Sequence, residues 1–266
     1  MFKKSIYICL GYLFFFVASA ALQSCEKKQR DSQDKNSVAG GSIVYVYYDI
    51  TEGLSDRERD IYLNDVGAIC ELMGLDSLEM DGGKGYGKVH INLINHENYR
   101  RPMLLKVEDR NEDEENEKIC RAKVIGFING FRDSVKIVLN KFLTERDTAQ
   151  TVITKKFIND LHSLKETSYK NKIMVVYSDM VEHNNDIGGV SFIDTDIVQK
   201  GDDFIKDMIE NAYKVSIKDS TFYNNVSIYI VRPDHEKYFL IRERLERFWK
   251  NVFGASCKFQ NILDFE

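Results

Sequence analysis

Apolar residues along the chain follow two alternating patterns. Nearly continuous apolar runs, typical of strands buried on both faces, occur at residues 42–49, 172–179 and 226–232. Residues 87–95 alternate apolar and polar positions, which predicts a less buried strand near a sheet edge. Apolar residues at helical spacing predict helices over residues 56–73, 119–143, 152–164, 202–213 and 235–253. Strands separated by such helices need crossover connections, so we expect an α/β sandwich with a doubly wound, mainly parallel sheet and helices on both faces.

The first 24 residues have a pattern of their own. Two lysines, an apolar run and several small residues follow one another, which predicts a targeting segment over residues 1–24. The adjoining "LQSC", residues 22–25, resembles a bacterial lipoprotein signal box, although Gln23 stands where that box usually has a small residue. The resemblance implies cleavage before Cys25 and lipidation of that cysteine. A transmembrane anchor is the alternative, and the apolar run is short for one.

Residues 25–41 are polar, lack periodicity and end in two glycines. We expect a flexible tether that spans roughly 20 Å over about 16 residues. Residues 42–266 are long enough for a single α/β domain. The chain is therefore expected to be lipid-anchored in a bacterial cell envelope, with the periplasmic face of the outer membrane preferred to the other locations.

Charge and cysteine content narrow the function classes. The formal net charge is −5 and becomes −7 once the two lysines of the signal are removed, so we expect no nucleic-acid partner. Cys70, Cys120 and Cys257 remain in the domain, without CxxC spacing, which argues against a zinc site and allows at most one disulfide of unassigned pairing. The acidic run at residues 108–118 predicts a solvated loop, because it lacks the glycine and regular ligand spacing of a calcium loop.

Two predicted strands end on carboxylates. Asp49 closes one strand and Asp179 closes another, each with hydroxyl residues nearby, including Thr51 and Ser178. The carboxyl ends of parallel strands meet at one edge of a sheet, where ligands bind in open α/β folds. Carboxylate and hydroxyl oxygens suit hard cations, so the pattern predicts a divalent-cation site.

The stretches "DITEGLS" at 49–55 and "KIMVVYSDMVEH" at 172–183 resemble the von Willebrand factor A family with its metal-ion-dependent adhesion site. The closing stretch at 226–255, with its Phe-Trp pair, is similar to bacterial proteins of that kind. The resemblance implies a Rossmann-like sandwich, a Mg²⁺ ion, with Mn²⁺ or Ca²⁺ as substitutes, and a partner carboxylate that completes the coordination. The residues that it assigns to the metal are Asp49, Thr51, Ser55, Thr151 and Asp179, with Thr148 as the next choice for the second-loop threonine.

Several of these residues have a structural alternative. The family pattern D-x-S/T-x-S puts its third position on Gly53, so Ser55 could bind metal only if the loop bulges. Ser55 with Glu58 also forms the S-x-x-E pattern of a helix capping box. Thr151 could likewise be a helix cap, and Trp249 lies on the apolar stripe of its helix and is expected in the core.

The sequence thus predicts a membrane-tethered binding module, and not an enzyme, that engages an acidic group of a protein partner through a divalent cation. A phosphohydrolase of the haloacid dehalogenase type is one alternative, with Asp49 as nucleophile, but Thr51 stands where its second acid belongs. A scaffold lipoprotein that has lost its metal is the other alternative, and Gly53 favours it.

Overall fold

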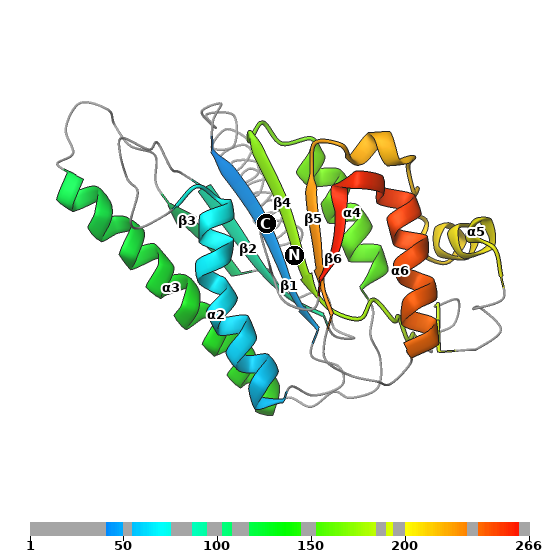
Figure 1. The fold of residues 1–266 in the computed structure, drawn as a ribbon, viewed down its shortest axis with the longest axis horizontal. Helices are drawn as coiled ribbons and strands as arrows, with labels where there is room; N and C mark the ends of the chain where they lie inside the picture. The colour runs from blue at the N-terminus through cyan, green and yellow to red at the C-terminus, as the bar shows by residue number, and fades with distance from the viewer. Residues whose placement is uncertain are drawn as a thin grey trace, which may run out of the picture. The chain divides into compact units, whose positions relative to one another are not determined.

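A six-stranded sheet in the order β3-β2-β1-β4-β5-β6 organises the chain (Figure 1). Its strands are β1 (Ser42–Asp49), β2 (Gly87–Ile94), β3 (Met103–Val107), β4 (Asn171–Tyr177), β5 (Ser227–Val231) and β6 (Cys257–Gln260). Every neighbouring pair is parallel except β2 with β3. The predicted doubly wound, mainly parallel α/β fold is confirmed.

This computed structural model describes residues 41–49, 55–75, 87–94, 103–107, 117–144, 153–184, 190–193, 200–232 and 239–260, which all belong to the unit Gly40–Glu266. The predicted signal, Cys25 and all of the tether except Gly41 lie outside the described residues. In the part of the chain that is described, no helix is both long and apolar enough to cross a bilayer.

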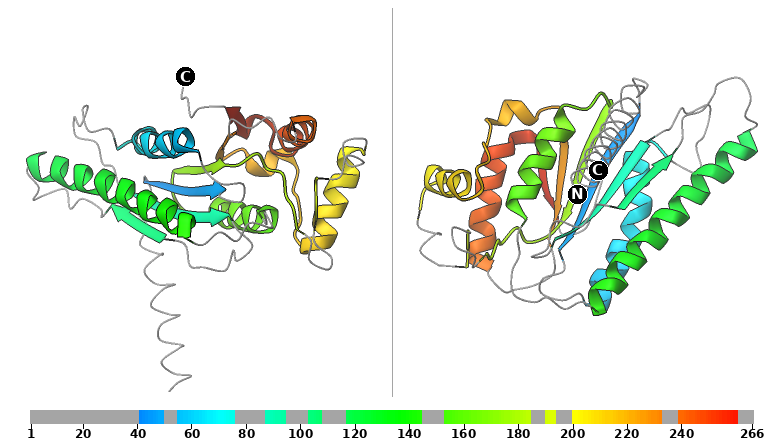
Figure 2. Two further views of the ribbon diagram at one scale, coloured as in Figure 1. Left: turned by 90° about the horizontal axis from the view of Figure 1, so that it is seen from below. Right: turned by 180° about the vertical axis from the view of Figure 1, so that it is seen from behind.

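Helices cover both faces of the sheet (Figure 2). They are α2 (Asp56–Leu72), α3 (Glu117–Thr144), α4 (Thr154–Lys165), α5 (Asp202–Tyr213) and α6 (Phe239–Phe253), with short 3-10 turns η3 (Ser220–Tyr223) and η4 (Gly254–Ser256). Along β1, Val44, Val46 and Tyr48 join an apolar cluster with α2 and α3. The alternate residues Ile43 and Tyr47 join a second cluster with α4, α5 and α6. An apolar core therefore covers each face of the sheet at β1.

Local sequence sets both ends of α2. Ser55 and Glu58 form the predicted capping box at the start. At the end, the Leu75 N–H donates to Cys70 O at 2.9 Å and the Gly74 N–H donates to Glu71 O at 2.8 Å, while Gly74 has φ +74°. This is a Schellman motif, in which glycine adopts the left-handed conformation without steric cost.

The start of β2 also requires glycine. A Cβ atom on Gly87 would lie 2.7 Å from the backbone oxygen of Ser42 and 2.5 Å from the end of the Met73 side chain. The neighbouring strand therefore leaves no room for a side chain at this position.

Two edge strands were not predicted. β3 and β6 are only five and four residues long, so their sequences carry little periodicity of their own. β2 is the second strand from one edge of the sheet, beside β3, which agrees with the prediction that it lies near an edge. Trp249 is fully buried and stacks on Phe253 with ring centroids 5.2 Å apart, which confirms its place in the core.

The two cysteines whose side chains are described do not pair. Cys70, in α2, and Cys257, at the start of β6, are both buried free thiols. Burial raises the pKa of the Cys70 thiol to about 12, so this thiol stays protonated and unreactive near neutral pH. Cys70 is thus part of the apolar core between the sheet and α2.

Candidate functional site

The candidate site lies where the order of the strands reverses. The chain passes from β1 outward to β2 and β3, and β4 then returns to the other side of β1. In doubly wound sheets this switch point leaves a crevice at the carboxyl ends of the two strands, where ligands bind. Asp49, the last residue of β1, and Asp179, two residues beyond β4, therefore belong to the same edge.

A direct hydrogen bond joins the two strand ends. Tyr48 pairs with Tyr177 in the parallel register, so the residues that follow them, Asp49 and Ser178, emerge side by side. The Ser178 hydroxyl donates to Asp49 Oδ2 at 2.7 Å. Ser178 is buried and Asp49 is half-buried, which leaves the carboxylate partly accessible at the end of the strand.

The turn after β4 is held by its own side chains. The Met180 N–H donates to Ser178 Oγ and the Val181 N–H donates to Asp179 Oδ1, both at 2.9 Å. Met180 has φ +60°, a left-handed conformation that is uncommon for a residue with a side chain. Residues in strained backbone conformations persist only where the surrounding structure holds them, and they cluster at functional sites. The turn thus holds the Asp179 carboxylate next to Ser178, the residue that contacts Asp49.

A third segment reaches the same edge through Glu182. Its Oε2 accepts a hydrogen bond of 2.8 Å from the Thr154 N–H, the first residue of α4, and its Oε1 accepts one from the Tyr213 hydroxyl of α5. Ile153, at the N-cap position, supplies no side-chain hydrogen bond. A carboxylate from the β4 turn therefore caps α4, where the exposed N–H groups and the helix dipole favour negative charge.

Burial dominates the ionisation of Glu182. The side chain is fully buried, which raises its pKa to about 7, although the hydrogen bonds from Thr154 and Tyr213 act in the opposite direction. The carboxyl group consequently changes its protonation state near neutral pH. The sequence interpretation missed this residue, because nothing in "SDMVEH" distinguishes a buried glutamate from an exposed one.

The first turn of α2 forms the remaining described wall of the site. The Ser55 N–H and hydroxyl donate to Glu58 Oε2 at 2.8 and 2.7 Å, and the Glu58 N–H donates to Ser55 Oγ at 3.2 Å. The capping interpretation of this pair is confirmed. Burial, and then the charges of Glu58 and Asp49, raise the pKa of Tyr62, so both carboxylates lie close to this tyrosine.

Beneath Asp49 lies a cluster of tyrosines that the sequence did not predict. The rings of Tyr48 and Tyr177 stack with centroids 5.0 Å apart, and the Tyr62 ring lies 4.5 Å from that of Tyr177. The Tyr177 hydroxyl donates to Asp65 Oδ2 at 2.9 Å, and burial raises the pKa of Asp65 to about 6. These buried aromatic rings therefore pack against one another below the end of β1.

The predicted metal ligands are only partly described. Asp49 ends β1, Asp179 follows the adjacent strand β4, and Ser55 stands at the start of the helix that follows β1. Thr51, Thr151 and Gly53 lie outside the described residues. Within the described ranges, no group of three or more His, Cys, Asp or Glu residues is arranged to hold a metal ion. Among the described residues, the side-chain oxygen atoms that follow the two strand ends belong to the carboxylates of Asp49 and Asp179 and to the hydroxyl of Ser178.

Thr151 precedes α4 by only three residues. A ligand role for Thr151, Thr51 and Ser55 stays a prediction.

Comparison with known proteins gives no match: no protein-family model fits this chain, and no curated protein sequence matches it.

Proposed function

We propose that this chain is a membrane-tethered, von Willebrand factor A-like binding module that holds a divalent cation between Asp49 and Asp179 and uses it to engage an acidic group of a protein partner. The Ser178–Asp49 hydrogen bond carries the proposal, because it joins two acid-bearing strand ends at the switch point of the sheet. A mainly parallel sheet with β1 in its interior agrees with the fold that the sequence resemblance implies.

The arrangement of the loops supports the choice of ligands. Asp49 and Asp179 contribute hard oxygen atoms of the kind that Mg²⁺ prefers. A hydrogen bond from the Thr154 N–H to Glu182 joins the start of α4 to the turn after β4. Thr151 precedes α4 in the sequence, so we propose it as the third ligand, from the second loop. Two carboxylates leave a bound divalent ion with unfilled positions, which water or a partner carboxylate would occupy.

Titration calorimetry on the full chain with Mg²⁺ and Mn²⁺ tests the cation claim. We expect saturable binding that Asp49→Ala weakens at least about tenfold, because an inner ligand is lost. Asp60→Ala is the matched control, since Asp60 is an exposed acid of α2 and its removal leaves the strand ends unchanged. Absence of binding by the unmodified chain, or equal binding after Asp49→Ala, would contradict the proposal.

A metal-free scaffold lipoprotein is the second candidate, and specific contacts favour it. One Asp49 oxygen already accepts from Ser178, and the Ser55 hydroxyl is engaged with Glu58. Such contacts allow these side chains to satisfy one another without an ion. If the calorimetric titration shows no ion binding while the chain still captures a partner, this candidate replaces the first.

A further inference from the structure

The polypeptide enters the domain at the amino edge of the sheet, opposite the candidate site. The backbone N–H groups of Lys170 and Asn171 donate to Gly41 O at 3.0 and 3.2 Å, and β1 begins at the next residue. The described part of the chain therefore begins beside the connection between α4 and β4. The predicted tether starts from this point.

Four lysines gather around the same point, and we call Lys165, Lys170, Lys172 and Lys218 the lysine cluster. Lys170 and Lys218 are exposed. The Lys165 ammonium lies 3.6 Å from the centroid of the Phe222 ring in η3, and Lys172 donates to the backbone oxygen of Lys165. The cluster thus spans the end of α4, the start of β4 and the approach to η3.

Two carboxylates, Glu166 and Asp219, lie among the four lysines, so the cluster keeps an excess of positive charge. Burial lowers the pKa of His162, the charges of Lys218 and Lys165 lower it further, and Glu166 acts against them. Burial also lowers the pKa of Lys172, where the opposing effect of Glu166 is larger than the effect of Lys165. The nearby Asp219 carboxylate accepts from the Thr221 and Phe222 N–H groups, at 3.0 and 3.2 Å, and so serves as the cap of η3.

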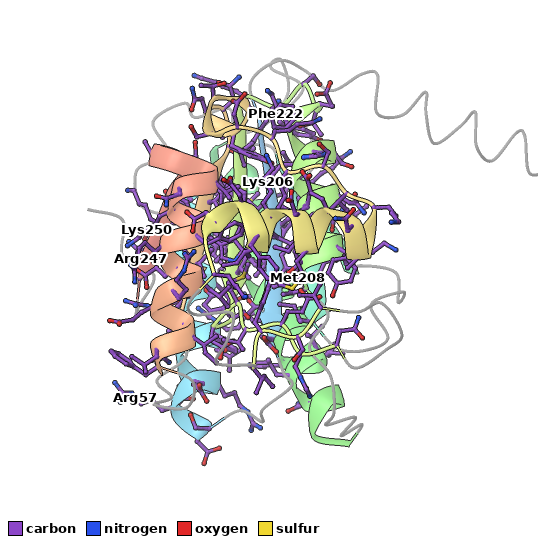
Figure 3. All side chains as sticks on the ribbon, turned by 90° about the vertical axis from the view of Figure 1, so that its right-hand side faces the viewer. Arg57, Lys206, Met208, Phe222, Arg247 and Lys250 are labelled. Atoms are coloured by element: carbon purple, nitrogen blue, oxygen red, sulfur yellow. The ribbon has the colours of Figure 1, made fainter. Side chains whose placement is uncertain are left out.

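The cluster and the candidate site lie at opposite ends of the strands. Figure 3 shows Phe222, against which Lys165 packs, at one end and Arg57, in the first turn of α2, at the other. The eight residues of β1 span about 26 Å between these edges. A membrane in contact with the amino edge would leave the cation site facing away from it.

We propose that the lysine cluster docks on the anionic phospholipid headgroups of the membrane to which the chain is tethered. This rests on the lipid anchor of the proposed function. Charge complementarity selects this occupant: the cluster is locally positive on a chain of net charge −5, and basic residues next to a membrane gain affinity for anionic lipid. A flexible tether of roughly 20 Å would let the cluster reach the surface, where the attraction acts within about one Debye length.

The test uses the full lipidated chain in two kinds of vesicle, phosphatidylcholine alone and phosphatidylcholine with phosphatidylglycerol in equal parts. All variants carry Cys120→Ser, so that a fluorophore attaches at Ser163→Cys, exposed on α4, or at Asp60→Cys, exposed on α2. Spin-labelled lipid headgroups quench a fluorophore that lies at the surface. Flotation of the chain, compared with Cys25→Ser, first checks the anchor itself.

We expect strong quenching at position 163 in the anionic vesicles only, and little quenching at position 60 in either. About 1 M salt, where the Debye length is about 3 Å, should remove the difference. Lys170→Glu with Lys218→Glu should reduce the docked population about tenfold. The control, Lys136→Glu with Lys155→Glu, reverses the same number of exposed lysines outside the cluster and should leave the quenching unchanged.

Three results would overturn the docking proposal while the anchor stands: equal quenching at position 163 in both vesicles, no effect of Lys170→Glu with Lys218→Glu, or stronger quenching at position 60. If the chain does not float, or if Cys25→Ser floats equally well, the lipid anchor of the proposed function is wrong. Docking is then overturned together with it.

Discussion

The Ser178 hydroxyl donates to Asp49 Oδ2 at 2.7 Å and accepts from the Met180 N–H at 2.9 Å, so one buried side chain joins the end of β1 to the turn after β4. The contact orients the Asp49 carboxylate and supports the left-handed residue at position 180. The geometry of the candidate site therefore depends on Ser178, whether or not this side chain contacts a ligand.

Ser178→Ala should therefore destabilise the protein. The change leaves the Met180 N–H without its acceptor and Asp49 without this donor, which costs about 1–3 kcal/mol of unfolding free energy. Urea denaturation measures the loss, and Ser216→Ala, at an exposed serine, should change the free energy by less than about 0.5 kcal/mol. Equal stability of Ser178→Ala and the unmodified chain would show that this contact is unimportant.

Glu182 predicts a dependence of stability on pH. Its pKa is about 7 in the folded protein and about 4.3 when unfolded, so the folded state holds the proton more tightly. The contribution of Glu182 to the unfolding free energy should then be largest below about pH 4 and fall by roughly 4 kcal/mol as the pH rises through about 7.

Glu182→Gln should remove this contribution, because glutamine stays neutral and can still accept from the Thr154 N–H. Urea midpoints at about pH 5 and about pH 8 provide the comparison. Asp65, whose raised pKa has the same sign, contributes equally to both proteins. The exposed Glu243→Gln is the control, and a slope that Glu182→Gln leaves unaltered would refute the assignment.

The two stacked tyrosines should respond differently to loss of the hydroxyl. Tyr177→Phe deprives buried Asp65 of a donor and should cost about 1–2 kcal/mol. The Tyr48 hydroxyl is buried without a hydrogen-bond partner among the described residues, so Tyr48→Phe should be neutral or slightly stabilising. Chemical denaturation of both variants decides, and a larger loss for Tyr48→Phe would contradict the arrangement.

Ser55→Ala distinguishes a helix-capping role of Ser55 from a role as metal ligand. Loss of the N-cap should lower the unfolding free energy by about 1 kcal/mol. A double-mutant cycle with Glu58→Ala should show that the two changes are not additive, because they remove the same reciprocal contacts. Calorimetry on Ser55→Ala should show a smaller loss of Mg²⁺ affinity than Asp49→Ala causes; an equal loss would make Ser55 a ligand.

Local patterns predicted much of the fold. The bounds of β1 and α5 agree with the structure residue for residue, since a continuous apolar run and a helical stripe each carry their own periodicity. β3 and β6 were not predicted, because strands of five and four residues are too short to show a clear periodicity and are defined by pairing with a neighbouring strand. The capping box of Ser55 and the helix stop at Gly74 were predictable, since both depend on residues close in sequence.

The sequence by itself determined the alternation of strands and helices, the ends of α2 and the two carboxylates placed after apolar runs, because those features depend on neighbours within a few residues. Only the tertiary structure decided that β4 pairs with β1, which brings Ser178 to Asp49. It also decided that Glu182 lies buried at the start of α4. Those relationships join residues 28 to 129 positions apart, and burial depends on which surfaces pack together.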